Sequence, residues 1–528
     1  MIGAISTLGD LAQTAGVIVA ALLAAAVLLA RSDRARAAAM LGAIVLTPVL
    51  LVASIWSTPQ LAPLRDQPLL AAAAAAGGMV LLALGAWAIH RRPAVVALAA
   101  AAALPFRVPI ESGGDTANLL LPLYLVIAAG VLAYAVPRLR APAGLDDDGR
   151  EDDVHKRGAL EWLLAASVVL YAVQAAYSSD FDKALSQLIF FYVPFALLFA
   201  LLARVPWTPR LAGQCLAVLL ALAVAFVAIG FVEYAKRELL LNPKVISSNQ
   251  FESYFRVNSL FFDPNIYGRF LATVMLGLTA LLLWSRRTAV AAGCAAALVA
   301  LWAGLVLTLS QSSFTALLAG LAVLGALRFG ARRAGGVVAA FAVAGIAVAL
   351  LAPGAVGLDQ SSKQVTSGRS ELVEGGLQLA ADKPLTGWGS GAFRHEFRRQ
   401  EKTSSARASA ASHTIPITVA AEQGIGGLLV YLALVVVAIG GLLRTRSPGG
   451  SQGTGGARQP IARAAVAAAF VALVVHTLLY AAFLEDPLAW ALLAVGAALR
   501  PARSSRRTRS PGGSQGTGDA AAAEPAPP

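Results

Sequence analysis

Charged side chains are scarce in this sequence. They make up 13% of the residues, whereas soluble domains carry about 25%. Apolar residues make up 58% of the chain, and its mean hydropathy is +0.69. Apolar runs of about 18 or more residues recur along the chain and predict transmembrane helices. This composition excludes a soluble enzyme.

Cysteine is also scarce. The two cysteines, Cys215 and Cys294, both lie in apolar runs, where we expect them to act as small packing residues. They predict neither a metal site nor a disulfide framework. The first apolar run, 11–30, lacks the preceding basic residues of a signal peptide. We therefore expect it to be a retained helix.

The apolar runs predict an all-α polytopic membrane protein with about 12–15 transmembrane helices. Alternate loops are basic, which assigns them to the cytoplasm, with the N-terminus outside and the C-terminus inside. This pattern accounts for the net charge of +13 without a nucleic-acid partner. The abundance of arginine and alanine suggests a bacterial source, and hence the bacterial cytoplasmic membrane. The predicted spans are centred near residues 20, 46, 79, 102, 127, 168, 195, 222, 275, 298, 320, 344, 432, 473 and 493.

Loop length and composition divide the predicted chain further. An acidic stretch, "LDDDGREDD", predicts a cytoplasmic linker, and the Pro-, Ala- and Gly-rich C-terminus predicts a disordered tail. A long ordered loop is usually functional, and two long loops fall outside the membrane. The predicted parts are 1–140 (N-terminal helices), 141–158 (linker), 159–352 (central helices with the outer loop 233–265), 353–422 (extracytoplasmic catalytic loop), 423–500 (C-terminal helices) and 501–528 (tail).

The longer outer loop predicts two amphipathic helices that lie along the membrane surface. The first covers 369–381, with Leu372, Val373, Leu377 and Ala380 on one face. "GWGSG" then predicts a turn, and a strongly basic helix follows over 392–402. Trp388 and Phe393 are candidates for contact with the membrane interface. Both helices would hold polar side chains at the outer surface.

Arginines gather in these outer loops, against the positive-inside tendency. The guanidinium offers a fixed fork of donors that suits phosphate oxygens. We favour a phosphate-bearing ligand for the group, and solvated or lipid-headgroup contacts are the alternative. The arginines are Arg256 in the shorter loop and Arg369, Arg394, Arg398, Arg399 and Arg407 in the longer one.

Three histidines lie near the predicted outer face. His413 stands where the long loop meets the next apolar span, and it is a candidate for either catalysis or a loop-anchoring hydrogen bond. His395 sits among arginines, where headgroup contact and catalysis are equal alternatives. His476 lies inside a predicted span, where a functional role has to be considered. For His476 we favour a neutral side chain bonded to a neighbouring helix.

Three stretches, in this order, resemble the O-antigen ligase and polymerase family of bacterial membrane glycosyltransferases. "FRVNSLFFDPNIYGRFLA" resembles its arginine, aromatic and Pro-Asn pattern at the start of a span. "GRSELVEGGLQLAADKPLTGWGSGAF" is similar to its arginine-led helix and Pro-Leu-x-Gly-x-Gly turn. "SHTIPITVAAEQGIGGLLVYLAL" is similar to its histidine motif, with Thr414 where asparagine is more frequent. The resemblance covers mainly residues 256–443.

The resemblance implies a GT-C-like helical fold and transfer of a glycan from an undecaprenyl diphosphate lipid to an acceptor hydroxyl. This reaction takes place at the outer face of the cytoplasmic membrane, with no nucleotide sugar, cofactor or metal. The implied partners are the lipid-linked donor, a glycan, lipid or cell-wall acceptor, and membrane lipids. By resemblance, His413 matches the catalytic histidine, Arg256 and Arg369 match the diphosphate-binding arginines, and Arg394 and Arg398 are further candidates.

The chemistry fits these roles. A diphosphate leaving group gains charge in the transition state, so fixed cations there lower the barrier. A histidine with an ordinary pKa of about 6.5 can accept the proton of the attacking hydroxyl. Direct displacement would invert the anomeric centre. Three alternatives stay open: a repeat-unit polymerase of the same family, a membrane transporter with discontinuous helices and midplane charges, and a non-catalytic assembly partner.

Overall fold

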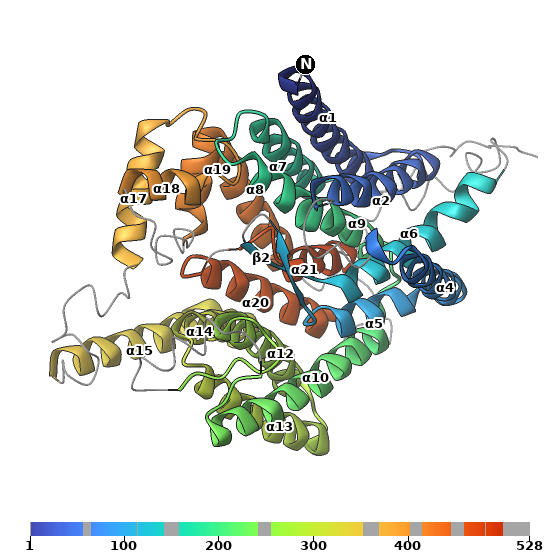
Figure 1. The fold of residues 1–528 in the computed structure, drawn as a ribbon. Coiled ribbons are helices and arrows are strands. Elements are labelled where there is room, and N and C mark those ends of the chain that lie inside the picture. The colour runs from blue at the N-terminus through green and yellow to red at the C-terminus, as the bar shows by residue number, and fades with distance from the viewer. Residues whose placement is uncertain are drawn as a thin grey trace, which may run out of the picture.

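Most of the residues that the structure describes are helical. The computed structural model describes residues 2–55, 65–112, 115–141, 158–240, 255–351, 369–401, 414–444, 459–480 and 482–499 (Figure 1). The elements, in order, are α1 (Ile2–Leu29), α2 (Asp33–Ile55), α4 (Pro68–Arg91), α5 (Ala94–Ala103), β1 (Val108–Ser112), β2 (Asp115–Leu119), α6 (Leu121–Arg140), α7 (Ala159–Ala175), α8 (Phe181–Gln187), η3 (Leu188–Tyr192), α9 (Val193–Leu202), α10 (Pro209–Lys236), α12 (Pro264–Trp284), α13 (Thr288–Thr308), α14 (Gln311–Phe329), α15 (Ala331–Leu351), α17 (Arg369–Asp382), α18 (Phe393–Glu401), α19 (Ile415–Leu443), α20 (Gln459–Thr477) and α21 (Pro487–Ala498).

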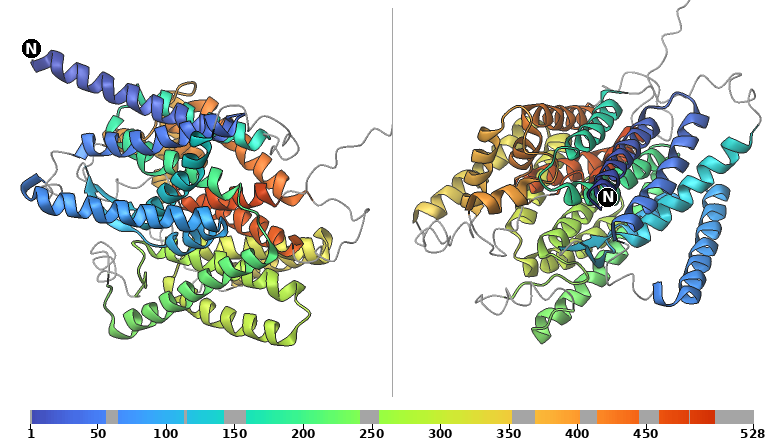
Figure 2. Two further views of the ribbon diagram at one scale, coloured as in Figure 1. Left: turned by 90° about the vertical axis from the view of Figure 1, so that its right-hand side faces the viewer. Right: turned by 45° about the horizontal axis from the view of Figure 1, so that its top comes forward.

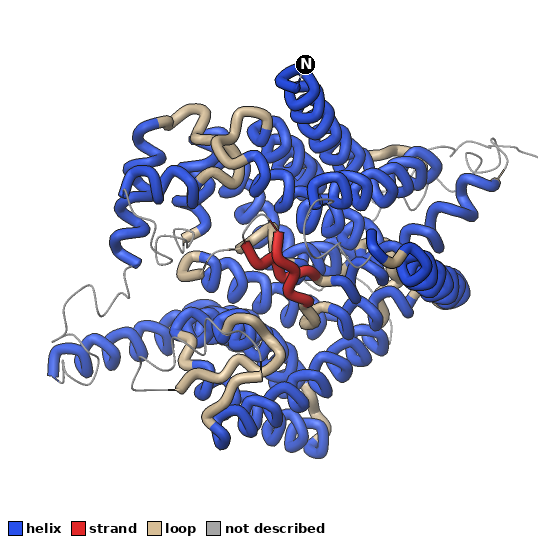
Figure 3. Tube along the Cα trace, in the orientation of Figure 1, coloured by secondary structure: helices blue, strands red, loops and turns tan. Residues whose placement is uncertain are grey.

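The predicted all-α membrane fold is confirmed. Every predicted span centre lies inside a helix. Within the described ranges, ten helices are long and apolar enough to cross a membrane, and four shorter apolar helices accompany them. Most long helices run in roughly one direction or its reverse, as two further views show (Figure 2). In the same described ranges, an antiparallel hairpin of β1 and β2, with Val108 opposite Leu119, interrupts the helical pattern (Figure 3).

α20 joins two buried clusters because its opposite faces carry different side chains. Ala464, Ala468 and Ala472, four residues apart, contribute to a cluster built mainly from α10, α12, α13 and α14. Phe470 and Leu473 contribute to the larger cluster of α1, α2, α5 to α9, α19 and α21. Small residues at such spacing let membrane helices approach closely, where dispersion forces and hydrogen bonds supply the attraction. α20 therefore fixes how the two sets of helices sit relative to each other.

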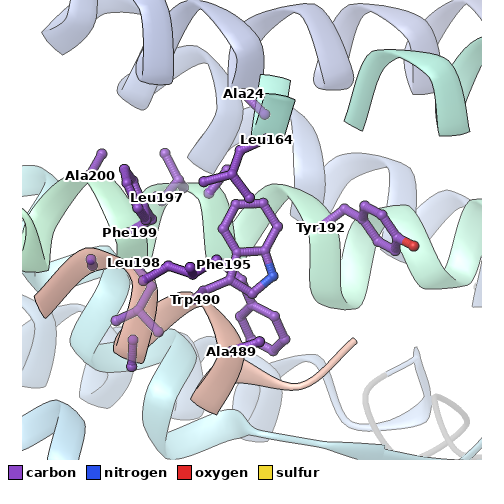
Figure 4. Close-up of a cluster of buried hydrophobic side chains, with 14 of the residues drawn as sticks. Ala24, Leu164, Tyr192, Phe195, Leu197, Leu198, Phe199, Ala200, Ala489 and Trp490 are labelled. Atoms are coloured by element: carbon purple, nitrogen blue, oxygen red, sulfur yellow. The ribbon is translucent and has the colours of Figure 1, made fainter. Parts of the chain in front are cut away.

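The larger cluster centres on α9 and α21 (Figure 4). The Trp490 ring of α21 is fully buried near Phe195 and Leu198 of α9, and its indole N–H donates to the Leu484 carbonyl oxygen at 2.8 Å. A buried indole needs such an acceptor. This bond ties the turn before α21 to the core, and that turn carries residues of the candidate site.

The span from α8 to α9 contains one π-helical turn, η3. Pro194 follows it and has no N–H with which to bond the Phe190 carbonyl oxygen four residues earlier. The Tyr124 hydroxyl of α6 donates to that oxygen at 2.6 Å instead. The proline thus explains both the irregular turn and the contact between α6 and this span.

Candidate functional site

Arg256 lies in the chain that leads into α12 and is held on two sides. Its Nε donates to the Thr308 carbonyl oxygen at 2.9 Å, and its NH2 donates to the Asn265 Oδ1 at 3.2 Å. The neighbouring Val257 N–H donates to the Leu307 carbonyl oxygen at 3.1 Å. The end of α13 and the start of α12 therefore fix the guanidinium plane, as recognition of a phosphate group requires.

The first turn of α12 begins with a cap that the sequence specifies. Asp263 accepts the Asn265 N–H at 2.6 Å, and Pro264 stands at the first helical position, where its missing N–H costs nothing. The cap orients the Asn265 side chain, whose oxygen also accepts the Ser310 hydroxyl at 2.8 Å. Asn265 therefore joins Arg256 to the turn between α13 and α14.

That turn is a buried cluster of hydroxyls. Ser310 caps α14 by accepting the Ser313 N–H at 3.3 Å, and the two hydroxyl oxygens lie 2.8 Å apart. Leu309 precedes them with φ 49°, a left-handed conformation that is costly for a residue with a branched side chain. Gly268 of α12 faces the cluster, and a Cβ there would lie 2.6 Å from the Ser313 hydroxyl. α12 and α14 can approach because this residue is glycine.

His476, at the end of α20, completes this network. Its Nε2 lies 3.2 Å from the Ser312 hydroxyl and 3.4 Å from the Ser313 hydroxyl, and its ring is fully buried against Tyr480. The prediction of a histidine bonded to a neighbouring helix is confirmed, since both serines belong to α14. Its Nδ1 has no hydrogen-bond partner within the described ranges.

The start of α19 reaches the same end of α20. The Thr414 hydroxyl donates to the Leu478 carbonyl oxygen at 3.1 Å, two residues after His476. His413 itself lies outside the described residues, so its side chain stays a prediction. Thr414, the residue that departs from the expected asparagine, therefore anchors the beginning of α19 to the chain that follows α20.

A second charged cluster lies beside the first. Arg269, one turn into α12, forms a buried ion pair with Asp486, which also caps α21. Burial lowers the pKa of the nearby Arg107 guanidinium, and Asp486 opposes the shift. Burial also raises the pKa of Tyr480, and the carboxylate of Asp263 adds to the increase. Arg107 and Arg269 are not among the arginines predicted from the sequence, although an arginine just inside an apolar run is a recognised signal.

The glycine-rich turn of the long loop docks onto α19. The Trp388 and Gly389 N–H groups donate to the Ala421 and Glu422 carbonyl oxygens at 3.0 and 2.9 Å. The Glu422 carboxylate accepts the Gly391 and Phe393 N–H groups at 2.9 and 3.2 Å, which caps the start of α18. α19 bends at Gly424, where φ is 64°. Two of the three quoted motifs therefore meet backbone to backbone.

The helix pair α17–α18 forms where the sequence predicts two helices, but its buried face differs. Leu372, Gly375, Gly376 and Leu379 face inward, whereas Leu377 is exposed. The glycines allow the Phe393 and Phe397 rings to lie against α17, since a Cβ on Gly375 would lie 2.4 Å from Phe397. The expectation that Phe393 contacts the membrane interface is wrong, because the ring is buried in this cluster.

The remaining predicted arginines lie on this pair. Arg369 is the first residue of α17, and its side chain lies outside the described part. Arg394 and Arg398 are half-buried on α18, next to the exposed Arg399, whose guanidinium lies 3.5 Å from the Glu396 carboxylate. In Figure 1 this pair lies above α20, whereas α12 and α14 lie below it. Arg256 and the α18 arginines thus belong to different elements.

Most of these polar groups lie at or near the ends of helices. Fold and site together define a multi-pass membrane protein with a buried polar network at the ends of several helices. Residues 296–432 match the family model for O-antigen ligase. This match over part of the chain supports the O-antigen ligase and polymerase family assignment that the sequence predicts, and that family implies a glycosyltransferase-like ligase or polymerase. The match includes His413, Arg369, Arg394 and Arg398, and Arg256 precedes it. A search of curated proteins finds no match.

Proposed function

We propose that the protein transfers a glycan from an undecaprenyl diphosphate carrier to an acceptor hydroxyl at the outer face of the bacterial cytoplasmic membrane. One observation carries the proposal. Thr414, the residue after His413, bonds to the same end of α20 that holds His476 in the Arg256 network. This anchored residue directly follows His413 in the chain, which supports a role for His413 in activating the acceptor next to a diphosphate bound by Arg256.

The proposed step is a direct displacement. The acceptor oxygen attacks the anomeric carbon while His413 takes the hydroxyl proton. The bond between that carbon and the diphosphate oxygen breaks, and its electron pair leaves with undecaprenyl diphosphate. Arg256 and Arg369, with Arg394 and Arg398 as further candidates, would stabilise the charge that develops on the leaving group. The glycan would be transferred with inversion and without a metal ion.

The acceptor decides between two forms of this reaction. A terminal acceptor such as a lipid core, a protein or a cell-wall polymer makes the protein a ligase, and a second lipid-linked repeat unit makes it a polymerase. Both need the same leaving group. A single product size favours the ligase, and a ladder of increasing repeats favours the polymerase.

His413→Ala in membranes tests the catalytic assignment. We expect transfer from a lipid-linked glycan to fall about a hundredfold or more, because general-base catalysis contributes a factor of this order. His90→Ala is the matched control, since His90 is exposed in the last turn of α4 and has no proposed role in transfer. Turnover close to wild type in His413→Ala, at equal protein levels, would reject the role of His413.

A further inference from the structure

The cluster around Arg269 holds more cationic donors than its acceptors use. Arg269 is 4% exposed, and one of its terminal nitrogens pairs with Asp486. The other terminal nitrogen, NH1, is buried and has no hydrogen-bond partner within the ranges that the structure describes. The same holds for the buried Nε of Arg107. A buried guanidinium N–H without an acceptor is costly, so a ligand that supplies acceptors would be stabilised there.

Both arginines line one cavity. Its volume is about 50 Å³, and Asp486, Phe261, Ile266 and Phe270 contribute to its wall. At roughly 10–15 Å³ for each water position, this is space for about three to five water-sized groups. The Asp486 carboxylate is shared between Arg269 and the Leu488 N–H, which donates to it at 2.9 Å. The cavity therefore contains two guanidinium groups but one carboxylate, and that carboxylate already accepts a hydrogen bond from the backbone.

The cavity lies next to the Arg256 network. Asn265, which binds Arg256, and Arg269 stand four residues apart on α12 and hence on the same face. Their Cα atoms are offset by about 6 Å along the helix axis. The Arg256 guanidinium, which Asn265 holds, and Arg269 therefore give two cationic positions about one helical turn apart along α12, and this arrangement suits a ligand that carries two adjacent anionic groups. Arg269 lies further into the apolar helix than Asn265 does.

We propose that Arg107 and Arg269 form a second anion subsite, which takes the phosphate bonded directly to the lipid carrier, while Arg256 faces the phosphate bonded to the glycan. This inference rests on the proposed function and extends it. The position of Arg269 further along the apolar helix suits the phosphate that is closer to the polyprenyl chain. Free inorganic phosphate shares the same chemistry, so the experiment has to separate the two sources.

Binding of undecaprenyl phosphate tests the subsite without any transfer reaction. The full-length protein is placed in nanodiscs of phosphatidylcholine, and native mass spectrometry measures affinity for undecaprenyl phosphate and, separately, for inorganic phosphate. We expect Arg107→Gln to weaken lipid binding about tenfold, as loss of one charge-assisted hydrogen bond implies. Arg269→Lys, which keeps the charge opposite Asp486, should weaken it by a smaller factor.

Arg36→Gln is the matched control. Arg36 is also buried and paired, with its NH1 2.7 Å from Asp33 on α2, so its loss tests general destabilisation. Equal affinity in wild type and Arg107→Gln, or an equal loss in Arg107→Gln and Arg36→Gln, would overturn the subsite. Arg107-dependent binding of inorganic phosphate as tight as that of the lipid would overturn the assignment to the carrier. Wild-type glycan transfer is measured in parallel: transfer with Arg107-independent lipid binding rejects the subsite alone, and Arg107-dependent binding without transfer rejects the proposed function alone.

Discussion

At the scale of single residues, Asn265 connects more of the site than any of its arginines does. Its side-chain oxygen accepts from Arg256 and from Ser310, and its backbone oxygen accepts the Ser313 hydroxyl at 3.2 Å. It is 8% exposed. An amide is suited to this position because its oxygen can accept two donors without adding a charge to the network.

Asn265→Ala should therefore reduce glycan transfer although it changes no charged group. The change leaves the Ser310 hydroxyl and one Arg256 nitrogen without their acceptor, at a cost of about 1–3 kcal/mol in stability. We expect transfer to fall at least about tenfold, because a guanidinium that is free to turn no longer faces the ligand. Thr315→Ala on the exposed side of α14 is the control. Transfer rates and thermal unfolding of both variants check this, and equal transfer rates would contradict the role of Asn265.

Glu485 predicts a pH dependence of stability. It lies in the turn before α21 and accepts a hydrogen bond from Gln187. Burial raises the pKa of this carboxyl, while Lys183 and Gln187 oppose the increase. The folded protein thus holds the proton more tightly than the unfolded chain, whose reference value is 4.5. The contribution of this group to the free energy of unfolding is fully present below pH 4.5. It is lost as the pH rises from there through the raised pKa of the folded protein.

Glu485→Gln should cancel this loss, since the amide oxygen still accepts from Gln187 and carries no charge. The melting temperature of the variant should equal that of wild type near pH 4.5 and exceed it increasingly toward neutral pH. Glu374→Gln, on the exposed side of α17, controls for the loss of one carboxylate. A difference between Glu485→Gln and wild type that stays constant with pH would refute the argument.

Some of these residues are visible in the sequence and others are not. Arg256 could be selected because it precedes a Pro-Asn pair at the start of an apolar span, and the role of His476 follows from its place inside a span. Arg107 and Arg269 were missed because their meaning depends on Asp486, which is more than two hundred residues away in the chain from either. Pairing over such separations is a tertiary contact and has no local pattern.

At the scale of elements, the docking of the glycine-rich turn onto α19 depends on backbone geometry. Gly387 has φ 67°, and a Cβ on it would lie 2.2 Å from the Glu422 carbonyl oxygen. Gly424, on the α19 side of this contact, has φ 64°. Both positions exclude a side chain, so the turn and the bend of α19 form only with glycine.

Gly387→Ala should displace the turn and weaken its bonds to Ala421 and Glu422. Left-handed backbone strain alone costs about 1–3 kcal/mol, and the clash adds to it. We expect a lower melting temperature and faster proteolytic cleavage near α17 and α18. Gly426→Ala is the matched control two residues beyond the bend, because a Cβ there meets no atom within 4 Å. Equal protease resistance in the two variants would argue against a docked turn.

Element boundaries show where sequence patterns reach their limit. The two amphipathic helices were predicted within one or two residues of α17 and α18. The observed buried face of α17 differs from the predicted one because glycines form the contact with the phenylalanine rings. Hydrophobic periodicity treats glycine as neutral and therefore does not include it in an apolar face. The hairpin of β1 and β2 falls in the loop between the predicted spans near residues 102 and 127, where a Gly-Gly pair between two short segments is a known hairpin signal. The π-helical turn at η3 could not be predicted from hydropathy, because it depends on Pro194 and on the hydrogen bond from Tyr124 together.

At the scale of the whole molecule, α20 connects the two buried clusters and the polar network at its end. One of its faces packs with the helices that carry Arg256 and the serine turn, and the other packs with α9 and α21. Its end binds the serine turn through His476 and the start of α19 through Leu478. Hydropathy predicts that this helix exists, but which faces it presents to which neighbours follows from packing of small residues over the whole fold.

The most direct test of the central claim is the fate of the lipid carrier. Purified protein is incubated with an undecaprenyl-diphosphate-linked glycan and an acceptor, and mass spectrometry and NMR identify the lipid product and the anomeric configuration of the new linkage. The account predicts release of one undecaprenyl diphosphate for each glycan transferred, with an inverted anomeric centre. Folded protein that leaves the donor unchanged, or that releases the glycan with its phosphate, would contradict it.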